Sequence, residues 1–268
     1  MIRDITIGQY YPAESVIHRL DPRVKLVGTL TFIISLFLHR SFLMYLVAAV
    51  FLTIVIKASK VPFRFMIKGL KAIMVLLLLT VVFNMFLTPG TPLIRIWKLT
   101  LTVEGVKQAA FMAIRLAFLI VGSSVMTLTT TPNHLTDGME KGLAPLNKLH
   151  VPVHEVSMIM SIALRFIPIL LEETDKIMKA QEARGADFDS GNLIQKAKSL
   201  VPLLVPLFIS AFRRANDLAM AMEARGYRGG EGRTKMKPLI YQKRDRMAYG
   251  VLLGYLAVMI LVGQFAPF

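Results

Sequence analysis

Several residue types and motifs that mark common functional classes are missing from this 268-residue sequence. It contains no cysteine, which excludes disulfides, thiol nucleophiles and thiolate-bound metals. It has no Gly-x-x-x-x-Gly-Lys-Ser/Thr segment, the loop with which P-loop proteins hold nucleotide phosphates. His-Glu-x-x-His and Gly-x-Ser-x-Gly are also absent. We therefore expect a protein that is not an enzyme and that uses no metal and no cofactor.

Charged side chains are scarce, and acidic ones are the scarcer kind. Only 18% of the residues are charged, whereas 54% are hydrophobic, and a soluble domain has about 25% charged residues. Mean hydropathy is +0.56. The 32 Lys and Arg outnumber the 17 Asp and Glu, giving a net charge of +15. Because the cations stand in loops beside apolar runs, they are typical of a membrane protein. The lipid bilayer is thus a predicted partner, and nucleic acid is not.

Five apolar runs have the character of membrane-spanning helices. They cover residues 26–38, 43–56, 72–87, 106–130 and 247–265. Arg115 lies near the middle of the fourth run, where a charge facing lipid would be costly. Two roles are open for it: a structural anchor inside the helix bundle, or a contact with another subunit.

The distribution of cations predicts the orientation of these spans. With the N-terminus inside, 27 Lys and Arg lie on the inner side, three on the outer side and two in the fourth run. Inner loops of membrane proteins are enriched in Lys and Arg. We therefore predict a multi-pass protein of the cell membrane with a cytoplasmic N-terminus. Its domains would be a membrane domain at 1–130, a cytoplasmic or interfacial domain at 131–246, and a last spanning helix at 247–268.

The predicted interfacial domain contains two further apolar runs, at 156–171 and 200–212. Runs this short more often form interfacial or buried helices than membrane spans. We expect Pro168, Pro202 and Pro206 to bend these helices from the membrane surface toward the cytoplasm. In the alternative both runs cross the membrane, and the chain is an autonomous secondary transporter with seven spans.

The same four residues, Glu-Ala-Arg-Gly, end the charged segment that follows each of these two runs. They are Glu182, Ala183, Arg184, Gly185 and Glu223, Ala224, Arg225, Gly226. One copy alone would be an ordinary helix end, since Gly adopts the left-handed conformation and Arg faces the negative end of the helix dipole. Two copies at equivalent points of two similar helices fit two equivalent acidic grooves on a two-fold or pseudo-two-fold partner. We expect both Glu residues to cap or orient the arginines.

Together with HRLDPRVKL at His18–Leu26 and the five apolar runs, the doubled motif resembles the EcfT family. These proteins are the transmembrane coupling subunits of energy-coupling factor (ECF) type ABC transporters. The resemblance covers essentially the whole chain. It implies an all-α integral membrane protein with about five transmembrane helices and a cytoplasmic coupling domain of three helices. The first coupling helix would lie near 133–149, and the last two would be long and end in Ala-Arg-Gly motifs.

The resemblance also implies a function. Both Ala-Arg-Gly motifs would dock into grooves on two ABC-type ATPase subunits, which form a homo- or heterodimer. The membrane part would hold a separate substrate-binding membrane subunit. The chain itself would be non-catalytic, and it would transmit the ATP-driven motion of the ATPases for uptake of a vitamin or another micronutrient.

Overall fold

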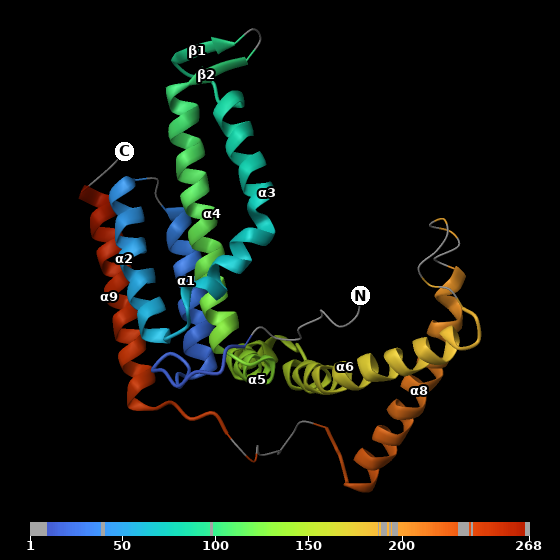
Figure 1. The fold of residues 1–268 in the computed structure, drawn as a ribbon. Coiled ribbons are helices and arrows are strands. Elements are labelled where there is room, and N and C mark those ends of the chain that lie inside the picture. Colours follow the sequence, from blue (N-terminus) through green and yellow to red (C-terminus); the bar gives the residue numbers. More distant parts are fainter. Residues whose placement is uncertain are drawn as a thin grey trace. The chain divides into compact units, whose positions relative to one another are not determined.

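A computed structural model describes most of the chain, and the described residues are mostly helical (Figure 1). The described residues are 10–38, 41–96, 99–186, 188, 192, 194, 198–229, 236 and 238–265. The predicted all-α membrane class is therefore confirmed.

Contacts within the chain divide it into two units. Of the described residues, those within 10–138 and 239–265 form the large unit, and those within 139–238 form the small unit. The predicted domain boundaries, after residues 130 and 246, concern the position of the bilayer, which intramolecular contacts do not define. Those boundaries stay predictions.

The large unit contains the five predicted membrane spans. Each lies largely within one helix: α1 (Pro22–Leu38), α2 (Phe42–Ser59), α3 (Phe63–Leu87), α4 (Val103–Thr129) and α9 (Lys243–Phe265). In the described part of the chain, α2, α4, α9 and α6 of the small unit are long and apolar enough to cross a membrane, as is α3 when its two parts are joined. α1 has 17 residues, the lower end of the roughly 17–25 that a span needs.

α3 is bent, and the bend coincides with the predicted start of the third span. The parts Phe63–Lys71 and Ile73–Leu87 meet at 61°, and the apolar run begins at Ala72. Three of the nine residues before the bend are Lys or Arg, which hydrocarbon accommodates poorly. The polarity of the sequence thus changes where the helix changes direction.

A short hairpin between α3 and α4 was not predicted from the sequence. β1 (Pro92–Ile96) pairs antiparallel with β2 (Leu99–Thr102). β2 alternates Leu and Thr, the period-two pattern of a strand. Its last residue then starts α4, because the Thr102 hydroxyl accepts the Gly105 N–H at 3.0 Å and caps the helix.

The core of the large unit lies where α1, α2, α4 and α9 pack against one another (Figure 1). Its buried members include Phe32, Leu36, Tyr45, Ala48, Leu52, Val121, Val125, Tyr255 and Met259. The polar groups within it are paired: the Ser35 and Tyr255 hydroxyls lie 2.7 Å apart. Arg115 is also inside this bundle, and its Nε donates to the Tyr45 hydroxyl at 3.0 Å. This contact supports the structural role for Arg115.

The small unit is built from α6 (Val153–Glu182) and α8 (Val201–Ala224). α5 (Pro132–Leu143) and the 3-10 helix η2 (Ala144–Leu149) precede them, over the range expected for the first coupling helix. Pro168 and Pro206 lie inside continuous helices. Pro202 lies in the first turn of α8, where a missing N–H removes no helical hydrogen bond. The prediction that Pro202 bends a helix is therefore wrong.

Candidate functional site

The first Glu-Ala-Arg-Gly motif closes α6 with a defined hydrogen-bonded turn. The Gly185 N–H donates to the Glu182 carbonyl at 2.9 Å, and the Ala186 N–H donates to the Gln181 carbonyl at 3.0 Å. These two bonds form a Schellman motif, which satisfies carbonyls that a helix end otherwise leaves without partners.

The second motif closes α8 in the same way. The Gly226 N–H donates to the Glu223 carbonyl at 2.8 Å, and the Tyr227 N–H donates to the Met222 carbonyl at 3.0 Å. The two sequence repeats are thus also structural repeats. Each Arg occupies the last position before the left-handed glycine.

Backbone conformation explains the glycines of both motifs. Gly185 has a φ of +88° and Gly226 a φ of +68°, values that a residue with a Cβ adopts at a cost of roughly 1–2 kcal/mol. No heavy atom lies within 4 Å of the position that a Cβ would take at either glycine. The left-handed turn, and not crowding, therefore requires glycine here.

All eight motif residues are exposed. Among the residues that the structure describes, the side chains of Arg184 and Arg225 form no hydrogen bond and no ion pair. No hydrogen bond or ion pair joins the side chains of Glu182 and Glu223 to the arginines in the described part of the chain. That these two residues cap or orient the arginines stays a prediction. Their contribution to the turn comes from the backbone carbonyl, which any residue could supply.

The helices that carry the motifs cross each other in the small unit (Figure 1). At the crossing, Arg214 of α8 donates through Nη2 to the Glu173 carboxylate of α6 at 2.7 Å, and the Ser210 hydroxyl donates to the same carboxylate. The Gln181 side chain near the end of α6 lies 3.5 Å from the Pro202 carbonyl at the start of α8. The two helices therefore run past each other in opposite directions.

This crossing has approximate two-fold symmetry. Glu173 and Arg214 are 41 positions apart in sequence, and so are the motif arginines Arg184 and Arg225. Because these two helices run in opposite directions, their equivalent positions meet at a local two-fold axis, which passes near the Glu173–Arg214 pair. Each motif Arg follows the crossing residue by eleven positions, or about 16 Å of helix. Arg184 and Arg225 thus stand at the ends of two helix segments of equal length, 173–184 of α6 and 214–225 of α8, which we call the arms.

The exposed side chains of both helices are more apolar before the crossing than after it. Exposed apolar side chains crowd the part before it, including Val156, Ile159 and Met160 on α6 and Leu204, Val205, Phe208, Ile209 and Phe212 on α8. After the crossing α6 carries Asp175, Lys176, Lys179 and Glu182, whereas α8 carries Asp217 and Glu223, and both helices end in the Glu-Ala-Arg-Gly turns. Exposed apolar patches of this kind mark contacts with a membrane or another protein.

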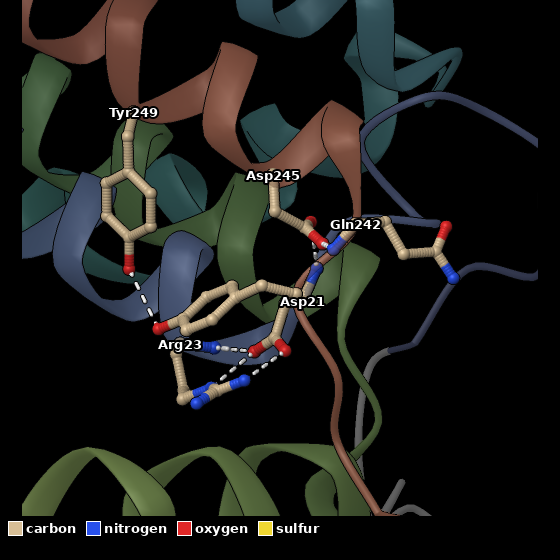
Figure 2. A network of polar contacts seen from close by, with 6 residues as sticks. Asp21, Arg23, Gln242, Asp245 and Tyr249 are labelled. Carbon is tan, nitrogen blue, oxygen red and sulfur yellow. Dashed lines mark hydrogen bonds and ion pairs between the residues drawn. The ribbon is translucent and has the colours of Figure 1, made fainter.

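A second polar cluster joins the starts of α1 and α9 in the large unit (Figure 2). The Asp245 side chain is 1% exposed and accepts the Asp21 N–H at 2.9 Å and the Gln242 N–H at 2.8 Å. Asp21 in turn accepts the backbone N–H of Arg23 at 2.9 Å and its Nη2 at 2.8 Å. Asp21 is thus the N-cap of α1, with Pro22 at the first helical position.

The other polar residues of the HRLDPRVKL segment also have partners. Lys25 Nζ donates to the Thr129 carbonyl at the end of α4 at 2.8 Å and to the His18 carbonyl at 3.2 Å. The His18 ring contacts the Tyr11 carbonyl at 3.0 Å, and burial lowers the pKa of His18. The segment therefore ties α1 to α4 and α9, and its composition is explained by the fold. Asp245 was missed from the sequence because its partner Asp21 lies 224 positions away.

Comparison with known proteins gives consistent matches over nearly the whole chain. The family model of cobalt transport proteins (CbiQ) matches residues 13–236. A Clostridium kluyveri protein is 59% identical over 264 residues, covering 97% of both chains. A Thermosediminibacter oceani protein is 53% identical over 264 residues (98% and 99% of the two chains), and a Bacillus subtilis protein 48% over 246 (91% and 93%). All three are named energy-coupling factor transporter transmembrane protein EcfT.

Proposed function

Because this chain belongs to the EcfT family of energy-coupling factor transporter transmembrane proteins, we propose that it couples two ABC-type ATPase subunits to a substrate-binding membrane subunit. It is a multi-pass membrane protein and one component of a multi-subunit transporter. The proposed role is non-catalytic: ATP-driven motion of the ATPases passes through this chain and drives uptake of a vitamin or another micronutrient at the cell membrane.

One observation carries the proposal: the two motif arginines are exposed and without partners on equivalent arms. Arg213 of α8 is also exposed and has no side-chain hydrogen bond among the described residues, so what distinguishes Arg184 and Arg225 is their place at two equivalent helix ends. Arg184 and Arg225 are thus available for a partner with two equivalent binding grooves, which a dimer of ATPases provides. A guanidinium binds carboxylates and carbonyls through several N–H groups at once. Each such bond to a charged group contributes roughly 1.5–3 kcal/mol.

The contacts of the small unit support a mechanical linkage between the docked ends. Glu173 joins α6 to α8 at the crossing, so a displacement of one arm moves the other. The Ser157 hydroxyl of α6 donates to the Glu140 carboxylate of α5 at 2.7 Å. α5 follows α4 of the large unit after two residues. Motion of the arms therefore has a path of packed contacts and continuous chain toward the membrane helices.

We assign the motif ends to the cytoplasm and the apolar parts of α6 and α8 to the membrane surface and the substrate-binding subunit. The apolar side chains before the crossing and the charged ones after it suit such a division. A seven-span transporter would need both α6 and α8 to cross the membrane. Of the described helices, α6 is long and apolar enough to do so, but α8 is not among those that are.

Arginine substitution tests the proposal directly. In the complete transporter, Arg184→Ala and Arg225→Ala should each weaken ATPase co-purification, and the double variant should nearly abolish it together with substrate uptake. Arg213→Ala is the matched control, because Arg213 is another exposed arginine of α8 outside the motif. If the double variant retains both ATPases and normal uptake, the motifs are helix ends and nothing more.

A further inference from the structure

An apolar pocket of about 420 Å³ opens between α1, α2, α4 and α9 of the large unit. All four helices contribute the ends that we predict to face the cytoplasm. Representative wall residues are Gly28 of α1, Ile54 and Val55 of α2, Met126 of α4, and Met247 and Val251 of α9. A volume of this size lies in the range of about 300–1,000 Å³ that holds small-molecule ligands.

The pocket exists because the four helices are packed only over part of their length. Toward the other ends of the helices, Leu36, Tyr45 and Met259 fill the interior. The pocket is closely packed beside Gly122 of α4 and open beside Gly28 of α1. A Cβ at Gly122 would lie 2.6 Å from the Phe32 ring, whereas a Cβ at Gly28 would meet no heavy atom within 4 Å. The space beside Gly28 is therefore open, although protein interiors are normally close-packed.

Positive charge lies at one end of this apolar space. Only four polar side chains line the pocket as far as the chain is described: Thr29, Thr129, Lys25 and Arg244. Lys25 uses two of its three N–H groups on backbone carbonyls. The buried Nε of Arg244 has no hydrogen-bond partner among the described residues. The two cations also repel each other, so an anion at this point would relieve an unfavourable interaction.

The nearby carboxylates do not supply that anion. Asp21 acts electrostatically on Lys25, but its carboxylate accepts three N–H groups of Arg23. The Asp245 carboxylate accepts the backbone N–H groups of Asp21 and Gln242. No acidic residue lines the pocket within the described ranges.

We propose that this pocket binds one phospholipid with an anionic headgroup. Its acyl chain fills the apolar space beside Gly28, and its phosphate accepts hydrogen bonds from Arg244 and from the remaining N–H of Lys25. An apolar slot with cations at the inner membrane surface is the arrangement with which spanning helices hold anionic lipids. The charge favours this occupant over the helix of a neighbouring subunit, which would bring no phosphate.

The test counts lipids on the full-length protein by native mass spectrometry, after partial delipidation and addition of phosphatidylglycerol or phosphatidylcholine with the same acyl chains. The wild type should retain one phosphatidylglycerol more firmly than the rest. Gly28→Leu, which fills the open space, should lose it. Gly254→Leu is the matched control, because Gly254 is also helical and open but lies outside the pocket.

The charge is tested separately with Arg244→Gln, which should reduce the preference for phosphatidylglycerol over phosphatidylcholine by roughly fivefold. Equal lipid retention by Gly28→Leu and Gly254→Leu would overturn the proposal, and so would an unchanged preference in Arg244→Gln. If the Gly28→Leu protein fails to fold, the space beside Gly28 is not open, and this result would also contradict the proposal. Loss of a neighbouring subunit from Gly28→Leu with unchanged lipid would assign the pocket to a protein helix instead. None of these outcomes bears on the proposal that the two motifs dock to ATPase subunits.

Discussion

Breaking the contact between α6 and α8 should impair the transmission of motion to the membrane helices but leave the docking of the ATPase subunits intact. Glu173→Gln removes the charge that Arg214 and Ser210 share, while Arg184 and Arg225 keep their surroundings. The Glu173 and Arg214 side chains are 23% and 38% exposed, so solvent screens the pair in part. We therefore place its contribution at about 1 kcal/mol, at the upper end for surface ion pairs.

A loss of this size leaves both helices folded but loosens the crossing. ATPase co-purification should stay near the wild-type level in Glu173→Gln, whereas substrate uptake should fall several-fold. Glu172→Gln is the matched control, since Glu172 is exposed and adjacent. The charge-reversed pair Glu173→Arg with Arg214→Glu should recover part of the uptake. Full uptake in Glu173→Gln, or loss of the ATPases together with uptake, would refute the linkage through this contact.

Two further predictions concern stability and orientation. Asp245→Ala should lower the stability of the detergent-solubilised protein by about 3 kcal/mol or more, because two backbone N–H groups lose a charged acceptor worth roughly 1.5–3 kcal/mol each. A melting temperature equal to that of Asp217→Ala, which changes an exposed Asp, would contradict this. For orientation, the cysteine-free chain allows single-cysteine labelling of intact cells. Arg95→Cys should react with an impermeant reagent and Lys60→Cys should not, and the reverse pattern would invert the predicted topology.

Much of the fold could be predicted from the sequence because its strongest signals are local. Apolar runs of sufficient length gave five helices, and the cations before Ala72 coincide with the bend of α3. Gly185 and Gly226 marked helix ends because the left-handed turn needs glycine. Pro202 was misinterpreted because its effect depends on where the helix begins: in the first turn a proline costs nothing.

The contacts that assemble the candidate site were beyond sequence reasoning. Glu173 and Arg214 are 41 positions apart and have no local pattern that pairs them. Asp245 shows the same limit, since its partner Asp21 is brought close only by the packing of α9 against α1. The backbone role of Glu182 was hidden in the sequence for a different reason. At a Schellman turn the backbone carbonyl makes the bond, so side-chain chemistry gives no indication of it.

The central claim is that the two motifs hold two ATPase subunits, one each. Glu182→Cys and Glu223→Cys place reactive groups beside the motif arginines without removing a side-chain contact that the structure shows. In the assembled transporter, each single variant should cross-link to one ATPase subunit through a short thiol-reactive linker. The double variant should cross-link to both subunits of the same complex. Cross-links from both positions to the same ATPase subunit, or to none, would contradict the account.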